Sequence, residues 1–364
     1  MGNHLFIELL QIAAGARDAL SEVPAALDEW EFLFKNADKH GLLGVTSTAV
    51  EKLAERIDIP QEARLNWSLV AAQIRDHNAR QQKASAKLYR TFLESGFRNC
   101  ILKGQAAAAY YPEPSLRQSG DIDLWAEGSR QDVLSFLQKH FHVRSVVYHH
   151  CNPKIFKGIE VEVHFTPTWM NSPFANRRLQ RWFSACADTQ FSHFDERVGC
   201  CTPLPRFDGV YLLLHIYRHV LQEGIGLRQL LDYHYLLTHL EADDRHAIVC
   251  DLKSLGLYRF ARAVMYVLQE TFRTDDVILL CPPDARSGET LLQSILQSGN
   301  FGHADPVFNS PESRAEGILR HGWRKIKRNL RFLTLCPSEV FWMPWFVTWQ
   351  YFWRLRHGYL YKNR

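Results

Sequence analysis

Hydrophobic residues recur every three to four positions along the first quarter of the chain, which is the spacing of one face of an α-helix. The pattern extends over residues 1 to about 92, and its last and longest run covers residues 60–95. Gly41 and Gly44 lie near breaks in the pattern, and glycine interrupts helices readily. The sequence therefore predicts a helical N-terminal region over residues 1–92.

Strands and helices are predicted to alternate in the next part of the chain. Residues 98–102 favour a first strand, and Gly104 allows a sharp turn into an alanine-rich helix at 105–111. Pro112 would end that helix, because proline lacks the backbone N–H that a continuing helix needs. A strand-to-helix turn is therefore expected at Gly104.

Further strands follow at GDIDLW and at residues 143–148 and 159–165. Between the first two, Ser129 can cap a helix whose apolar face holds Val133, Leu134 and Leu137. Helical spacing returns from about residue 207 and ends in an aromatic tail. We therefore predict an α+β (mixed α/β) fold with a mixed-sheet core flanked by helical regions, divided into residues 1–92, 93–205 and 206–364.

Composition indicates a globular protein. The chain has 364 residues, of which 46% are hydrophobic and 12% aromatic, enough for substantial cores. Its eight cysteines show neither a CxxC pair nor a regular spacing, which argues against a zinc ribbon or a secreted disulfide framework. The first 20 residues contain Glu8 and lack a basic leader and a continuous apolar run of signal-peptide type, so we expect a cytoplasmic protein.

The net charge of +4 is concentrated near the C-terminus. Residues 301–364 carry 11 Lys and Arg against 4 Asp and Glu, or +7, whereas the first 300 carry 32 against 35, or −3. Residues 314–331 place apolar side chains near helical spacing among seven basic ones, and an aromatic run then ends at Trp353. Pro337, Glu339 and Pro344 interrupt that run, so it is not expected to span a membrane.

Two locations remain for this tail. A helix that docks on the protein's own core is the commoner origin of an apolar stripe. On that expectation the tail indoles should be buried, namely Trp323, Trp342, Trp345 and Trp349. The alternative is peripheral membrane contact, which a surface of Trp and basic residues also suits. No nucleic-acid recognition motif accompanies the charge.

The candidate chemistry begins with the two aspartates of GDIDLW. One apolar residue separates Asp121 from Asp123, so in a strand both carboxylates leave the same face, about 6–7 Å apart. Carboxylates beside a core repel each other and lose hydration unless a cation neutralises them. A lone Asp-x-Asp is more often a solvated edge or turn, so further residues are needed to support a Mg²⁺ site.

A later strand supplies them. Along residues 159–165, Glu160, Glu162 and His164 face one way while the hydrophobic residues face the other. A third carboxylate is therefore available. For Glu160 and His164, structural hydrogen bonding or solvent exposure is as reasonable an interpretation as function.

The order of these motifs resembles the nucleotidyltransferase superfamily. More narrowly, it is similar to an uncharacterised bacterial nucleotidyltransferase family that carries an LKG turn, an Arg before GDIDL and a vE/DvH strand. Here the matching residues are Lys103-Gly104, Arg117, Asp121-Ile122-Asp123 and Glu162-Val163-His164, within residues 98–168. One departure is that most of the superfamily has Gly-Ser at the turn, where this chain has Lys103-Gly104-Gln105, so a Ser contact to the triphosphate is not expected.

The resemblance implies a nucleotidyltransferase that moves an NMP group from an NTP, with ATP as the first choice, to an unidentified acceptor and releases pyrophosphate. It implies catalysis and Mg²⁺ binding, with Mn²⁺ as an alternative, by Asp121, Asp123 and Glu162. Glu162 has two roles open to it, metal ligand or general base. The resemblance also implies nucleotide binding by Lys103, Gly104, Arg117 and Gly120.

His164 is also a candidate for the cleft, and the helices after residue 207 contain three more, His215, His219 and Arg228. His215 and His219 lie one helical turn apart, the spacing of a zinc-binding helix, but Ile216 stands where a metalloprotease has its general-base Glu. We therefore expect a buried or cleft-lining pair. Arg228 and Asp232 are also one turn apart and could form an ion pair or line an acceptor cleft.

Two rival functions remain open on sequence grounds. A binding protein that keeps the fold with weak or no activity is favoured by the missing Ser, but the presence of all three carboxylates argues against it. A toxin-type enzyme that modifies a protein or a tRNA would suit the basic tail. The acceptor, the base preference and the oligomeric state have no readable pattern.

Overall fold

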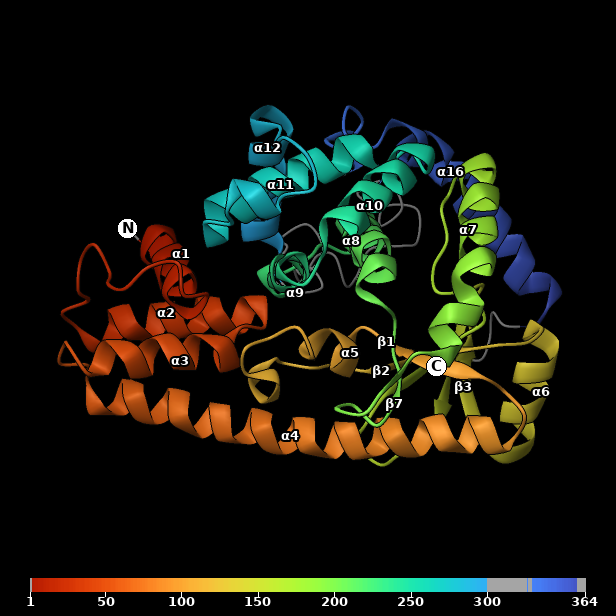
Figure 1. Cartoon of the computed structure of the whole chain (residues 1–364), viewed down its shortest axis with the longest axis horizontal. Helices are drawn as coiled ribbons and strands as arrows, with labels where there is room; N and C mark the ends of the chain where they lie inside the picture. Colours follow the sequence, from red (N-terminus) through yellow and green to blue (C-terminus); the bar gives the residue numbers. More distant parts are fainter. Residues whose placement is uncertain (1, 300–325, 327–328, 359–364) are drawn as a thin grey trace.

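The computed structural model describes residues 2–299, 326 and 329–358. Its longest element is α4 (Gln61–Glu94), which runs beneath the molecule from one end to the other (Figure 1). Three short helices lie over one end of α4 and a β-sheet lies over the other end. The short helices are α1 (Gly2–Ala13), α2 (Leu27–His40) and α3 (Leu43–Ala54).

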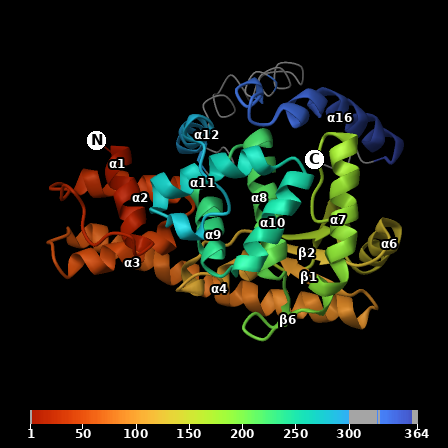
Figure 2. The same ribbon diagram turned by 45° about the horizontal axis from the view of Figure 1, so that its top comes forward.

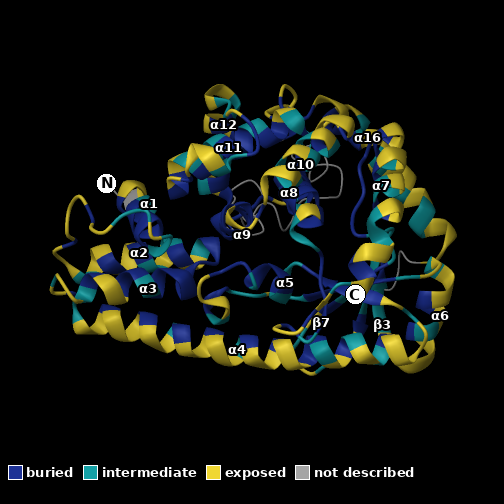
Figure 3. Cartoon of the chain, viewed as in Figure 1, coloured by how far each residue is buried: buried dark blue, intermediate teal, exposed yellow. Residues whose placement is uncertain are grey.

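The sequence of α4 explains its long, one-sided packing. Its buried residues recur every three to four positions, from Ala63 and Trp67 to Leu88 and Phe92, so one face meets the molecule and the opposite face meets solvent (Figure 3). The helix predicted at residues 60–95 is thus confirmed. Within its buried face, Asn78 and Gln81 are polar and face the loop that precedes the predicted aspartates.

The sheet is mixed, with strand order β1-β2-β5-β4-β3. The central pair β2 and β5 is parallel, and the other neighbours are antiparallel. The strands are β1 (Asn99–Leu102), β2 (Ile122–Ala126), β3 (His142–Val146), β4 (His150–Lys154) and β5 (Val161–His164). The predicted α+β fold is confirmed, while β4 and the small hairpin β6 (Phe194–Asp195) and β7 (Cys200–Cys201) were not predicted.

Strand β2 is buried on both faces, not on one face as its sequence indicates. On one side, Trp125 packs against Phe183, Phe191 and Phe207, which come from two helices beyond the sheet. On the other side, Leu124 packs in a cluster with Leu88 and Phe92 of α4. Because β2 lies between two hydrophobic layers, the backbone that carries the aspartates is held rigidly.

The helices beside the sheet are α5 (Gly104–Ala108), η1 (Pro114–Leu116), α6 (Arg130–His140) and α7 (Pro173–Ser192). Ser129 caps α6 by accepting a hydrogen bond from the backbone N–H of Asp132, as predicted. Helix α5 is shorter than the segment predicted at 105–111. The 20-residue α7 was not predicted, although Ala175, Leu179, Phe183 and Phe191 recur at helical spacing and form its buried face.

The C-terminal helices form a layer above the sheet and continue over the short N-terminal helices (Figures 1 and 2). Helices α8 and α9 lie nearest to α5 and are almost entirely buried. The elements of this layer are α8 (Pro205–Gln222), α9 (Leu227–Thr238), α10 (Ala242–Ser254), α11 (Tyr258–Phe272), η2 (Asp276–Ile278) and α12 (Ala285–Ser298).

Helix α16 (Pro337–Arg356) lies along the outside of the molecule beside α7 (Figure 2). Trp345 and Trp349 are 66% and 45% exposed, so the prediction that the tail indoles are buried is wrong for both. Trp342 is partly buried, and Trp323 and most of the segment predicted at 314–331 lie outside the described residues. Among the described helices, none is long and apolar enough to cross a membrane.

Candidate active site

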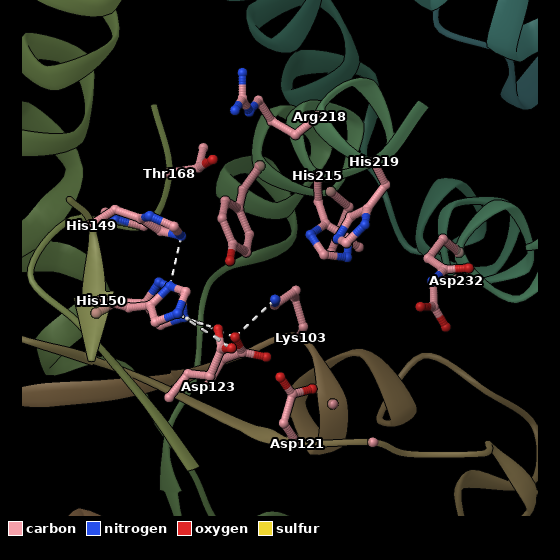
Figure 4. A pocket seen from close by; sticks show the side chains of 18 of the residues that line it. Lys103, Asp121, Asp123, His149, His150, Thr168, His215, Arg218, His219 and Asp232 are labelled. Atoms are coloured by element: carbon pink, nitrogen blue, oxygen red, sulfur yellow. Dashed lines mark hydrogen bonds and ion pairs between the residues drawn. The ribbon is translucent and has the colours of Figure 1, made fainter. Parts of the chain in front are cut away.

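A pocket of about 220 Å³ lies between the sheet and the helices α8 and α9. All of the residues that the sequence analysis selected line it: Lys103, Gly104, Arg117, Gly120, Asp121, Asp123, Glu162, His164, His215, His219 and Arg228. These residues come from parts of the chain up to 125 positions apart, so the fold brings them together in one cavity. Figure 4 shows side chains from both walls.

The floor of the pocket is built by strand register. Asp123 on β2 lies directly opposite Glu162 on β5, because these strands are parallel neighbours. His164 follows Glu162 by two residues and so shares its face, and His150 lies opposite His164 on β4. Asp121 precedes β2 and lines the same cavity. Four strand positions and one loop position thus converge.

Asp123 is almost completely buried and carries two cationic partners. Its Oδ1 lies 2.8 Å from Lys103 Nζ and accepts a hydrogen bond of 2.8 Å from His164 Nε2 (Figure 4). Burial would raise the pKa of Asp123, but Lys103 and His164 outweigh burial, and the pKa is lowered from its ordinary value. Asp123 is therefore ionised at neutral pH.

Asp121 lies in a different electrostatic environment. The negative charge of Asp123, followed by burial, raises the pKa of Asp121 to about 6, although Lys103 opposes the shift. Two carboxylates only two residues apart in the sequence thus have pKa values displaced in opposite directions. An additional positive charge in the pocket would therefore stabilise ionised Asp121.

Glu162 and its neighbouring histidines continue the network. Glu162 Oε2 lies 3.4 Å from His164 Nε2, and Glu162 Oε1 lies 3.4 Å from His150 Nε2. A hydrogen bond of 2.7 Å then joins His150 Nδ1 to His149 Nε2. Burial opposes ionisation of Glu162, but His164 and His150 outweigh it, and the pKa of Glu162 is lowered.

The histidines of this network divide into two kinds. Burial lowers the pKa of His164, yet its bonds to Asp123 and Glu162 outweigh burial and raise the pKa to about 9, so it is an imidazolium at neutral pH. Burial lowers the pKa of His150 to about 4, and it also lowers that of His149. These two rings are therefore neutral and present unprotonated nitrogen atoms.

The turn from β1 into α5 positions Lys103. Both Lys103 and Gly104 have positive φ angles, 50° and 41°, which side chains rarely adopt and glycine adopts readily. This backbone turn directs the Lys103 side chain over β2. Because the positive φ at Lys103 is sterically unfavourable, surrounding contacts must hold it, and such strain is common at functional sites.

The loop that leads into Asp121 is fixed by side chains from α4. Asn78 Nδ2 donates to the carbonyl oxygens of Ser115 and Arg117, and Gln81 Nε2 donates to that of Gly120. From α3, Gly44 approaches so closely that a Cβ atom there would lie 2.1 Å from the carbonyl oxygen of Leu116. The N-terminal helices therefore support the pocket.

Arg117 is buried and its guanidinium is paired with Asp232 of α9. Its Nε and Nη2 each donate to the Asp232 carboxylate at 2.7 Å, and Tyr111 donates to the same carboxylate at 2.6 Å. Asp232 thus pairs with Arg117, while Arg228 donates to the carbonyl oxygen of Gln118. Arg117 links the loop before Asp121 to α9.

Helix α8 forms the upper wall with side chains one turn apart. Tyr211, His215 and His219 line the pocket, and the rings of the two histidines are 4.3 Å apart. Burial, then the charge of Lys103, lowers the pKa of both histidines, that of His219 to about 3. They are neutral cleft-lining groups.

Arg218 of α8 connects the pocket to α16. Its guanidinium lies 4.0 Å from the centre of the Trp169 ring, and its Nη1 is 3.5 Å from the carboxylate of Glu339 at the start of α16. The sequence analysis missed Arg218, Trp169, His149 and His150. The consecutive histidines could have been noticed, whereas Trp169 and Arg218 carry no local signal.

Within the part of the chain that the structure describes, two groups of side chains could hold a metal ion. In each group the candidate ligand atoms lie within 4.8 Å of one another: Asp123, Glu162 and His164 in one, and His149, His150 and His164 in the other. The predicted set of Asp121, Asp123 and Glu162 differs from the first group, because the described cluster contains His164 in place of Asp121. Asp121 nevertheless lines the same pocket.

Comparison with known proteins gives one match. A family model described as "Uncharacterised nucleotidyltransferase" matches residues 27–273, which run from the start of α2 to the end of α11. This match contains every element around the pocket floor and excludes α16. No curated protein and no solved structure matches the chain.

Proposed function

Because the chain belongs to the uncharacterised nucleotidyltransferase family, we propose that it transfers a nucleoside monophosphate from an NTP to an acceptor and releases pyrophosphate. The observation that carries the proposal is the pocket floor, where Asp121, Asp123 and Glu162 line one cavity with Lys103. An NTP needs such a combination of carboxylates for its cation and basic side chains for its phosphates.

The donor atoms in the pocket fit a divalent cation. Asp123 and Glu162 offer carboxylate oxygens within 4.8 Å of each other, and Asp121 can supply a further one from the same cavity. When bound, Mg²⁺ supplies charge neutralisation on the triphosphate and its leaving group. Mn²⁺ is the alternative; His164, which is an imidazolium in the metal-free protein, would have to lose its Nε2 proton before it could ligate either cation.

Lys103 and Asp121 have complementary tasks in this proposal. Lys103 Nζ neutralises Asp123 at 2.8 Å and has 15% of its side chain exposed to the pocket, so it can share its charge with an incoming phosphate. Asp121, whose pKa is about 6, is mostly ionised at pH 7, and an entering positive charge would lower its pKa and stabilise that ionised form. These residues would adjust the local charge as the nucleotide binds.

Glu162 and Arg117 have different roles. The pKa of Glu162 is lowered, which makes it a poor proton acceptor, so we assign it to the cation and not to general-base catalysis. Both oxygens of Asp232 accept from Arg117, so we assign Arg117 to positioning the loop before Asp121. ATP stays the first choice of NTP, and the acceptor class stays open.

A matched pair of variants tests the proposal. Glu162 and Glu160 lie two residues apart, but Glu160 is exposed and pairs with Arg144 outside the pocket. With Mg²⁺ or Mn²⁺, each of the four NTPs and a broad set of acceptors, Glu162→Gln should lower pyrophosphate release by about 10²–10³-fold, the loss of several kcal/mol of charge stabilisation.

The control Glu160→Gln should keep wild-type turnover. Equal pyrophosphate release by wild type and Glu162→Gln would contradict the assignment of the pocket. Nucleotide binding without pyrophosphate release for any acceptor would favour a non-catalytic binding protein with this fold.

A further inference from the structure

Helix α16 has two faces of opposite character. Its inner face packs on the protein, where Trp353 lies under Arg130 and Phe346 stacks on Trp169. Its outer face holds Phe341, Trp345 and Phe352, which are 65%, 66% and 60% exposed, and Trp349, which is 45% exposed, lies at the edge of that face, where its ring also contacts Tyr148 and Phe346. These four residues, here termed the aromatic face, recur every three to four positions and so form one continuous stripe.

Such a stripe is unusual on a protein surface in contact with water alone. Single exposed hydrophobic residues are common, but a contiguous row of large aromatic side chains marks a surface that contacts another partner. The aromatic face also lies beyond residues 27–273, so the family match does not account for it. It requires its own explanation.

The charge of the C-terminal part of the sequence indicates what that partner is. From residue 317 to 364 the sequence carries ten Lys and Arg and one acid, Glu339. Glu339 is 1% exposed and is held by Arg218 and by the backbone N–H groups of Asn171 and Ser172. Among residues 329–358, Arg331 and Arg356 are therefore exposed, Arg356 at the end of α16, and no carboxylate is exposed.

We propose that the aromatic face docks the protein on an anionic lipid surface, with α16 lying in the plane of that surface. Trp and Phe favour the boundary between headgroups and acyl chains, and arginines reach the lipid phosphates. None of the described helices could cross the bilayer, which agrees with a helix that lies on it. A helix of this kind would insert its apolar side about 5–10 Å.

Docking would place the pocket beside the lipid surface. Phe346 of α16 stacks on Trp169 at 5.9 Å between ring centres, and Trp169 lines the pocket. A second groove of about 290 Å³ lies between α16 and residues 148–176, and Trp345 and Trp349 form part of its wall. Phe346, which also lines this groove, therefore connects the groove to the pocket through Trp169.

Flotation of the full chain with vesicles tests the proposal. The protein should float with vesicles of phosphatidylcholine and phosphatidylglycerol, and less with phosphatidylcholine alone or at high salt. The triple variant W345S/W349S/F352S should bind at least tenfold more weakly. Neutralising Arg331 and Arg356 should weaken binding by about fivefold for each, since one basic residue near the surface contributes about 1 kcal/mol.

Two controls keep the result interpretable. The variant L65S/L69S alters two comparably exposed hydrophobic residues of α4, 55% and 52% exposed, and should float like wild type. Asp121→Asn should also float like wild type while losing transfer activity, so failure of docking and failure of the proposed enzyme function give different results. Thermal melts of every variant confirm folding.

Two results would overturn the proposal. One is binding that is equal for anionic and neutral vesicles or that survives the triple variant. The other is self-association in the absence of lipid that the triple variant abolishes, which would identify a second copy of the chain as the partner.

Discussion

The pocket floor and the aromatic face both depart from the usual distribution of side chains in a folded protein. The floor holds charged side chains in the interior, and the aromatic face holds large apolar side chains on the surface. The floor buries Asp123 and His164 and partly buries Glu162, whereas α16 exposes Trp345 to solvent. The buried charges are balanced by partners within the protein, such as Lys103 at 2.8 Å from Asp123. The described apolar stripe has no such partner across most of its area. Buried charges that are paired within the protein suit a chemical site inside the molecule. Exposed aromatic residues without such partners indicate contact with another molecule.

The largest expected effect concerns Arg218 and Glu339, the buried pair that joins the two regions. Glu339→Gln leaves Arg218 buried with its charge unbalanced, which should lower the free energy of unfolding by about 3–5 kcal/mol. Urea denaturation measures the loss. The exposed pair Arg98 and Glu127 is the control, and Glu127→Gln should cost less than about 1 kcal/mol.

If Glu339→Gln lowers the free energy of unfolding no more than Glu127→Gln does, the pairing of buried charges seen in the pocket does not extend to α16. The pocket floor and the aromatic face would then be independent of each other. The double variant R218M/E339Q removes both charges and should recover much of the lost stability.

A smaller effect is expected from the pH dependence of stability without divalent cations. The pKa of Asp121 is about 6 in the folded protein and near 3.8 when unfolded, so folding binds a proton there between these values. The stability that Asp121 contributes is thus greatest at low pH and falls as pH rises through 6. Asp121→Asn should therefore melt higher than wild type at pH 8, by about 2–4 °C per kcal/mol relieved.

At pH 3.5 the two proteins should melt together, because Asp121 is protonated in both states. Thermal melts in EDTA across this range make the comparison. A variant that melts lower than wild type at pH 8 would mean that Asp121 forms a stabilising ion pair and is not a repelled carboxylate.

The smallest expected effect separates an exposed indole from a buried one. Trp345→Ala should change the free energy of unfolding by less than about 0.5 kcal/mol, because the side chain is 66% exposed. Trp67→Ala, at 1% exposed, should cost about 3–5 kcal/mol. A large loss for Trp345→Ala, measured by urea denaturation, would place that indole in the protein's own packing and remove the contrast between the regions.

Sequence could predict the pocket because its chemistry is local. Asp123 and Glu162 lie on strands with clear alternation, Asp121 directly precedes the first of them, and the turn at Gly104 is visible from one glycine between a strand and a helix. The pairing of Arg117 with Asp232 is different, since 115 positions separate them. No periodicity reports such a contact, so Arg117 was assigned to the triphosphate.

The tail could not be predicted for a related reason. An amphipathic pattern shows that a helix has an apolar side, but it does not show whether that side packs against protein or against a lipid surface. In α16 both faces carry aromatic residues, so sequence alone gives no inner face. The ring of Trp353 contacts Arg130, the first residue of α6, and Tyr148, which lies between β3 and β4. Both residues are about 200 positions away in the sequence, so only the folded structure reveals these contacts.

Helix α4 has a consequence for how this protein could evolve. Its single span of 34 residues carries Trp67 into the N-terminal core and, on its next turns, Asn78 and Gln81 to the loop before Asp121. A recombination event near residue 92 would therefore separate that loop from the groups that hold it. We expect the first 92 residues to be inherited together with the sheet, and a chimera joined at that point to fold poorly unless the incoming helix supplies equivalent amide donors.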